Sequence, residues 1–281
     1  MITAPRTLLF LLASSLAFAQ GGRGGPGGFG GPGAQLDMEG KGAEAREAFQ
    51  KAYDSAATPA AKAQALRNIA MSWAFEGNCK KTAEYEDKVI EYWKTQEAEQ
   101  PGNAFYQEGE MADEAARVCI DYGDLDTAAA YYKKGRDLGA KEPNIAAGRK
   151  DLWEYRYQHA LARLAARRGN KAEAQKQVEA ARATLERMKT DDPNLYQQQI
   201  GFLPYLTGYV AYYAGDYQTA LADFQKDTRN DAFITAMMAM TYEKLGDNAK
   251  AKEYWQKAAG ARGHNPPAAF AVPTARKKLG E

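Results

Sequence analysis

The chain has few of the residue types that carry catalytic or metal-binding chemistry. Only two histidines, His159 and His264, occur in 281 residues, and they lie far apart in the sequence. No HExxH, Cys-x-x-Cys, GxSxG or phosphate-loop pattern is present. We therefore predict no catalytic residue, no metal site and no cofactor, and we expect that the protein is not an enzyme.

An excess of charge of either sign is also lacking. Lys and Arg together number 37, Asp and Glu number 36, and the net charge is +1. No overall field therefore favours nucleic acid or an anionic membrane surface as a partner. β-Branched residues are sparse, and much of the hydrophobic fraction of 45% is Ala and Tyr, which favours helices over strands. We expect no nucleic-acid partner and an all-α fold.

The chain has one apolar run of note, at residues 8–19, after the positive charge of Arg6. Its twelve residues are too few to cross roughly 30 Å of hydrocarbon, and it ends in Ala17-Phe18-Ala19, a pattern typical of signal-peptide cleavage sites. We predict a signal peptide at 1–19 and a soluble protein, periplasmic or extracellular, with no integral membrane segment after cleavage. The dense glycine of residues 20–36 predicts a disordered linker.

From residue 37 to 281 the sequence is organised around a repeated Gly–Asp/Asn dipeptide. The first four copies are 46 residues apart and the fifth follows after 31: Gly77-Asn78, Gly123-Asp124, Gly169-Asn170, Gly215-Asp216 and Gly246-Asp247. A small residue precedes each glycine by seven positions, and in four copies Ala follows it by five. Glycine commonly ends one helix in the left-handed conformation, and Asp or Asn caps the next. Such a register predicts stacked helical hairpins.

We therefore predict an α-solenoid of about five helix-turn-helix hairpins with partial capping helices at both ends. The expected helix pairs are 58–76 with 79–98, 104–122 with 125–138, 144–168 with 171–189, 195–214 with 217–227, and 231–245 with 248–260, followed by a last helix at 268–279. Gly40, Ala45 and Phe49 repeat the same offsets. Residues 40–55 are accordingly expected to be the second helix of a repeat whose first helix is degenerate or missing.

This pattern resembles the tetratricopeptide repeat (TPR). The residues that carry the resemblance include Ala239, Tyr242, Gly246-Asp247, Ala251 and Trp255 in the fifth copy, and the likeness covers about residues 40–281. Two features depart from the family: the 46-residue step exceeds its 34, and Ala165 stands where an aromatic residue is expected. The longer step adds about three helical turns per repeat and predicts an irregular superhelix.

The resemblance implies which first-helix positions face a concave groove. In the third hairpin these include Arg156, His159, Arg163 and Arg167; in the fourth, Phe202, Tyr205, Tyr209, Tyr212 and Tyr213; in the second, Glu110, Asp113, Arg117, Ile120 and Asp121. A basic strip beside a tyrosine strip is suited to an extended peptide or a chain with carboxylates. The alternative is that the arginines are solvated and the tyrosines pack between repeats.

We therefore expect an exported, non-enzymatic scaffold that binds a protein or peptide partner in this groove. The binding interpretation predicts that Arg163→Ala and Tyr209→Ala weaken partner capture without lowering the melting temperature. Two alternatives stay open. One is an envelope- or polysaccharide-associated assembly factor that uses the Tyr-rich groove, and the other is a structural protein that forms homo-oligomers.

The two cysteines fall near successive turns. Cys79 follows the first turn directly, and Cys119 lies one helical turn before the second. In a stacked array the turns fall along one edge, which places the two side chains within bonding reach. Export to an oxidising compartment would permit a disulfide, which we predict. The alternative is a pair of buried thiols.

Overall fold

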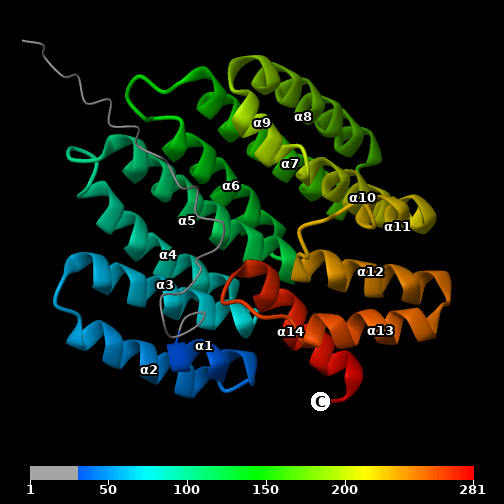
Figure 1. The fold of residues 1–281 in the computed structure, drawn as a ribbon, viewed down its shortest axis with the longest axis horizontal. Helices are drawn as coiled ribbons and strands as arrows, with labels where there is room; N and C mark the ends of the chain where they lie inside the picture. The colour runs from blue at the N-terminus through cyan, green and yellow to red at the C-terminus, as the bar shows by residue number, and fades with distance from the viewer. Residues whose placement is uncertain (1–30) are drawn as a thin grey trace, which may run out of the picture.

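The structure is a computed structural model that describes residues 31–281; the predicted signal peptide and the first part of the predicted linker lie outside these residues. The described chain is helical, without a strand. Its helices are α1 (Gly31–Met38), α2 (Gly42–Ser55), α3 (Pro59–Phe75), α4 (Cys79–Lys94), α5 (Pro101–Tyr122), α6 (Leu125–Gly139), α7 (Ala147–Arg167), α8 (Lys171–Asp191), α9 (Pro193–Gln199), α10 (Phe202–Ala214), α11 (Tyr217–Phe224), α12 (Ala232–Leu245), α13 (Asn248–Ala259) and α14 (Pro266–Leu279). Neighbouring helices pack in sequence order, as Figure 1 shows. The prediction of an all-α solenoid of stacked hairpins is confirmed.

The Gly–Asp/Asn dipeptides form the turns of the hairpins. All five glycines have positive φ angles, between 70° and 96°. The Asp or Asn that follows accepts a hydrogen bond on its side chain from the backbone N–H three residues later. Each dipeptide therefore ends one helix and caps the next, because glycine adopts the left-handed conformation without steric cost.

The small residues at fixed distances from the Gly–Asp/Asn dipeptides lie where helices approach each other closely. The alanines seven before the turn glycine, those five after it and Ala83, which is six after Gly77, are at most 4% exposed: Ala70, Ala83, Ala116, Ala128, Ala162, Ala174, Ala220, Ala239 and Ala251. A Cβ atom at Gly208 would come within 2.8 Å of the Phe224 ring. Small side chains let the two helices of a hairpin approach, and larger residues from the second helix then fill the space between hairpins.

The disordered linker predicted for residues 20–36 includes residues that are helical in the structure. Residues 31–36 belong to α1, which packs against α2. The physical reason is that glycine allows close approach here: a Cβ atom at Gly33 would lie 2.6 Å from the Phe49 ring. The first helix expected to be degenerate or missing is therefore present, as a helix of eight residues.

The helix predicted for residues 195–214 is broken into α9 and α10. Pro204 lies in the first turn of α10 and has no N–H to donate. In an unbroken helix its ring would clash with the carbonyl group of Ile200, four residues earlier. Gly201, a poor helix former, lies at the break. The two short helices follow from these two residues.

The last helix returns to the beginning of the solenoid. α14 packs on α12 and α13, as an end cap does, and also on α3 and α5. Figure 1 shows α14 lying between the last hairpin and the first helices. One apolar cluster joins the two ends of the chain through Met38, Met71, Ala74, Phe75, Val118, Ala268, Ala269 and Val272. The Tyr122 hydroxyl group donates a hydrogen bond of 2.8 Å to the carbonyl oxygen of Ala269.

The disulfide predicted for Cys79 and Cys119 is formed in the structure. The two sulfur atoms lie 1.99 Å apart and close a loop across 40 residues of sequence. Both side chains are buried in a cluster that also holds Ala116, Ile120 and Tyr132. The bond joins the start of α4 to the end of α5, so it connects the first two complete hairpins.

In the part of the chain that the structure describes, no helix is both long enough and apolar enough to span a bilayer.

One buried carboxyl group on α5 gives a prediction about pH and stability. Glu108 is fully buried, and burial, with the neighbouring Glu97 carboxyl group, raises its pKa to about 7. In the unfolded chain the group ionises near its ordinary value of 4.5. The folded state therefore loses stability as the pH rises from about 4.5 to about 7, because the unfolded chain releases this proton first.

We expect that Glu108→Gln, which cannot ionise, stabilises the protein more at pH 8 than at pH 5. The stabilisation, measured as the gain in unfolding free energy over the wild-type chain, should be about 2–3 kcal/mol larger at pH 8 than at pH 5, as the size of the pKa shift implies. Urea unfolding at the two pH values measures it. Glu44→Gln, at an exposed position, serves as the control. A Glu108→Gln effect that is the same at both pH values would contradict the prediction.

Candidate ligand-binding site on the inner face

The predicted groove residues come from two helices that pack together. Arg156, His159, Arg163 and Arg167 lie on α7, and the four tyrosines Tyr205, Tyr209, Tyr212 and Tyr213 lie on α10. The basic and tyrosine strips do lie side by side. We call the side of α3, α5, α7 and α10 that faces α14 and the loop before it the inner face.

Most of these residues are not on an open surface. His159, Arg163, Tyr205, Tyr209 and Tyr212 are all less than a tenth exposed. The prediction of an open groove lined by them is therefore wrong for these five. The physical reason is that the tyrosines fill the space between hairpins, where they pack with Phe233 and Met237 of α12. Arg156, Arg167 and Tyr213 stay partly exposed.

Arg163 is held by phenol groups. Its Nη1 donates to the Tyr205 hydroxyl group at 3.0 Å and its Nη2 donates to the Tyr132 hydroxyl group at 2.7 Å. It is 5% exposed and forms no ion pair with a described carboxylate, while its Nε has no hydrogen-bond partner. A buried guanidinium group is usually paired with a carboxylate, since the loss of hydration is costly otherwise. Arg163 is thus a buried cation whose hydrogen bonds go to neutral hydroxyl groups.

Arg117, on α5, is a second guanidinium group in the same region. Its closest carboxylate contact is a long one, 3.9 Å from Nε to Asp121 Oδ2, and its Nε and Nη2 have no hydrogen-bond partner. The guanidinium carbon lies 5.6 Å from the Tyr205 ring centre and 5.2 Å from that of Phe233. Because Arg163 lies at the same 5.6 Å from Tyr205, both cations share this ring.

The other charges of the inner face are paired. Glu110 accepts from Arg156 Nη1 at 2.5 Å, and Glu114 accepts two hydrogen bonds from Arg67. Asp113 lies 3.9 Å from Arg156. These carboxylates therefore concentrate around Arg156 and Arg67, whereas Arg117 has only the long contact with Asp121 and Arg163 has no ion pair with a described carboxylate.

Burial changes the protonation of this site. It raises the pKa of Asp113 to about 7 and that of Asp121 to about 6, although nearby arginines act in the opposite direction. His159 has a pKa well below its usual value, first because of burial and then because of the positive charges of Arg163 and Arg117. Its ring is neutral at pH 7. At pH 7 Asp121 is therefore mostly ionised and Asp113 about half ionised, while His159 adds no positive charge next to the two guanidinium groups.

A cavity of about 310 Å³ lies among these side chains. Helices α5, α7 and α10 supply the walls, and Asn265, Pro266 and Pro267 at the start of α14 complete the lining. The Tyr155 hydroxyl group, on a cavity residue that is 1% exposed, has no hydrogen-bond partner. The lining therefore combines aromatic residues, the buried Arg163, the half-buried Arg117 and polar atoms without partners.

Sequence reasoning found part of this site. It placed Arg117, Phe202 and the α7 and α10 residues on the inner face, but missed Tyr132, Tyr155 and Pro266. Tyr132 lies on α6, the second helix of its hairpin, whereas the prediction considered only first helices. Tyr155 lies one residue before Arg156, the nearest position that the TPR resemblance implied. Pro266 reaches the site only because α14 folds back, and no local pattern signals that return.

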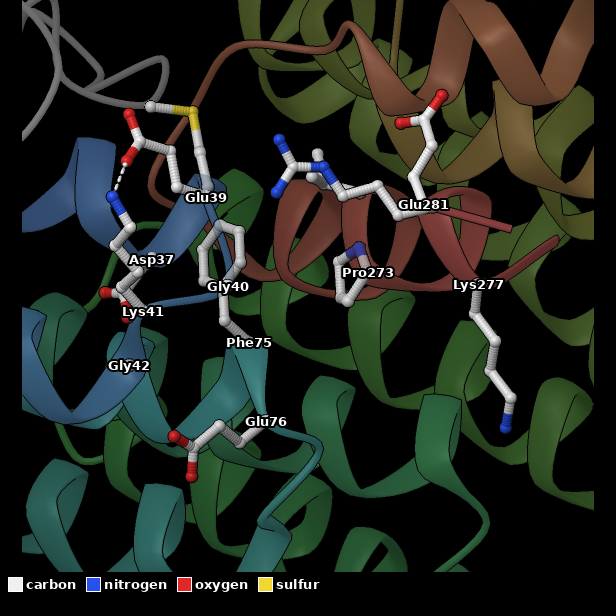
Figure 2. Close-up of a pocket in the computed structure, with 13 residues that line it drawn as sticks. Asp37, Glu39, Gly40, Lys41, Gly42, Phe75, Glu76, Pro273, Lys277 and Glu281 are labelled. Carbon is white, nitrogen blue, oxygen red and sulfur yellow. Dashed lines mark hydrogen bonds and ion pairs between the residues drawn. The ribbon is translucent and has the colours of Figure 1, made fainter. Parts of the chain in front are cut away.

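A second cavity, of about 790 Å³, lies where the ends of the described chain meet. Figure 2 shows Glu39 and Lys41, which form an ion pair of 2.8 Å, on the side of α1 and α2, and Pro273, Lys277 and Glu281 at the α14 side. Three of its charged residues are paired within the first part of the described chain: Glu39 with Lys41, and Glu76 with Arg46 of α2. The cavity follows from the contact between the two ends.

The second histidine also helps to hold these ends together. His264 Nε2 lies 2.8 Å from Asp37 Oδ2, and its ring stacks on Phe75 with centroids 5.6 Å apart. The Ser72 hydroxyl group donates to the other Asp37 oxygen at 2.7 Å. Ser72 therefore contacts the aspartate and not the histidine, so these three residues do not form the nucleophile–base pair of a catalytic triad.

Comparison with known proteins found no matching family model and no curated protein of similar sequence. Within residues 31–281, no cluster of three or more His, Cys, Asp or Glu side chains has the arrangement of a metal site.

Proposed function

We propose that the protein is an exported, TPR-like scaffold that binds a helical peptide segment of a partner protein on its inner face. The observation that carries the proposal is that α14 already lies on this face. Its Ala268, Ala269 and Val272 pack against side chains of α3 and α5. The face therefore accommodates a helix with small apolar residues on one side, held by contacts of the kind that helix-in-groove recognition uses.

The export part of the proposal is supported by the apolar run at residues 8–19 and by the disulfide. A tagged full chain expressed in a bacterial host should appear in the periplasmic or extracellular fraction with a reduced mass. Retention of the uncleaved chain in the cytoplasm would contradict export.

The resident helix must leave before a partner helix can bind the same residues. We expect that Val272→Asp, at a position 1% exposed, loosens α14 by burying a charge against Val118 and Phe75. A fluorescent peptide of residues 262–281 should then bind the variant at least tenfold more tightly than the wild-type chain, because the face is free. Fluorescence anisotropy measures both affinities.

The matched control is the same peptide carrying Val272→Asp, which should bind neither protein. Equal affinity of the two peptides for the loosened variant would show that binding does not use the inner face. No binding by a variant whose α14 is shown by proteolysis to be released would end the proposal of a peptide-binding face.

Sugar stacking by the tyrosines has less support from the structure. It needs exposed rings, but Tyr205, Tyr209 and Tyr212 are buried. Among the described residues, the exposed large hydrophobic side chain is Tyr122, at 38%. A polysaccharide-associated function remains an alternative that a glycan-binding screen would test.

A further inference from the structure

The 310 Å³ cavity beside Arg163 is a feature that peptide binding does not explain. A cavity of this volume is within the range of small-molecule sites. It lies between α5, α7 and α10, and Pro266 and Pro267 contribute to its lining. Its dimensions suit a compact organic molecule and not a helix about 10 Å across.

The charge around the cavity selects the chemistry of a ligand. Arg117 and Arg163 both line it, and Nε of each has no hydrogen-bond partner. Three carboxylates also line it: Glu110 and Glu114 accept hydrogen bonds from Arg156 and Arg67, and Asp113 lies 3.9 Å from Arg156. Arg163 is buried and has no ion pair with a described carboxylate, and Arg117 is half-buried with only Asp121 at 3.9 Å. Two such guanidinium groups favour an anion, because charge-assisted hydrogen bonds would offset their lost hydration.

The apolar residues that line the cavity favour a ligand with an apolar body. Phe202 and Tyr205 of α10 contribute to the lining, as do Pro266 and Pro267 of α14. The ring of His159 is part of the lining, and its low pKa keeps it neutral, so it adds no charge at pH 7. The unpartnered Tyr155 hydroxyl group supplies a further hydrogen-bonding atom. The lining thus offers cations, a hydroxyl group and hydrophobic surface.

We propose that this cavity binds a small organic carboxylate, with the carboxylate group held by Arg117 and Arg163 and the apolar body against Phe202 and Pro266. The proposal does not depend on peptide binding by the inner face, since the cavity residues differ from the residues of α3 and α5 that Ala268, Ala269 and Val272 pack against. It also accounts for the retention of two arginines in a region where paired or apolar side chains would cost less.

Isothermal titration of the full chain with 3-phenylpropionate tests the proposal. The neutral isostere 3-phenylpropionamide has the same shape without the charge, and inorganic phosphate is an anion without the apolar body. We expect 3-phenylpropionate to bind at least tenfold more tightly than either, because each loses one of the two features the cavity recognises. Equal binding of the acid and the amide would overturn the proposal.

Substitutions of residues that line the cavity test where the ligand binds. Arg163→Gln should weaken 3-phenylpropionate binding at least tenfold, whereas Arg167→Gln should leave it unchanged, since Arg167 lies one turn further along α7 and does not line the cavity. If Arg163→Gln does not fold, Tyr155→Phe replaces it, because that variant removes one unpartnered hydroxyl group. It should fold and bind several-fold more weakly. Undiminished binding by the folded variants would place the carboxylate elsewhere and overturn the assignment.

Discussion

Reduction of the Cys79–Cys119 disulfide is expected to lower the free energy of unfolding by about 4 kcal/mol. The bond closes a loop across 40 residues and so restricts the unfolded chain, and the chain-entropy relation gives this magnitude for that length. It also joins the start of α4 to the end of α5, so its loss should loosen the contact between two hairpins. Urea unfolding with and without a reducing agent measures the change.

The double variant Cys79→Ala and Cys119→Ala is the control for this experiment. It should have the stability of the reduced wild-type chain, less a small amount for lost packing, and should not respond to reductant. Thiol labelling of the unfolded, unreduced wild-type chain gives an independent answer. Two reactive thiols there would show that the bond is absent in the purified protein.

Tyr209→Ala is expected to destabilise the protein by about 3–5 kcal/mol, the range for loss of a large buried aromatic side chain. Tyr209 is fully buried, with its ring 4.8 Å from that of Tyr213 and 6.3 Å from that of Phe233. The binding interpretation of the sequence predicted no change in melting temperature for this substitution. Its burial now leads us to expect a large decrease, measurable by calorimetry or urea unfolding.

Tyr209→Phe separates the ring from its hydroxyl group. It keeps the packing and removes only a weak contact of 3.5 Å from Arg167, so it should cost less than about 1 kcal/mol. A Tyr209→Ala variant as stable as the wild-type chain would show that the ring is not a structural contact between α10 and α12. It would restore Tyr209 as a candidate binding residue.

The repeated Gly–Asp/Asn dipeptides allowed the hairpins to be predicted closely, because each turn depends on residues that are adjacent in the sequence. A left-handed glycine followed by a capping Asp or Asn is a constraint within a few residues, and the alanines at fixed offsets report close approach within one hairpin. The break before α10 was readable in principle from Gly201 and Pro204. The helix at residues 31–36 could not be predicted in this way. A high glycine content indicates disorder, but here the absence of a side chain at Gly33 lets α1 pack on Phe49.

The candidate site was only partly predictable. The register placed Arg163 and Tyr205 on neighbouring helices correctly, and the structure joins them by a hydrogen bond. It could not show that both are buried, because burial depends on how far α10 and α12 approach and on where α14 lies. Arg117 is half-buried, and its contacts with the Tyr205 and Phe233 rings depend on how α10 and α12 pack against α5.

By itself, the sequence determined the helices, their turns and the order in which the hairpins stack, since these follow from backbone conformation and from the size of residues at short, fixed spacings. Only the tertiary structure decided that α14 returns to α3 and α5 and that most of the side chains predicted to line an open groove are buried. Those features rest on contacts such as His264 with Asp37, 227 residues apart, and packing over that separation leaves no periodic trace in the chain.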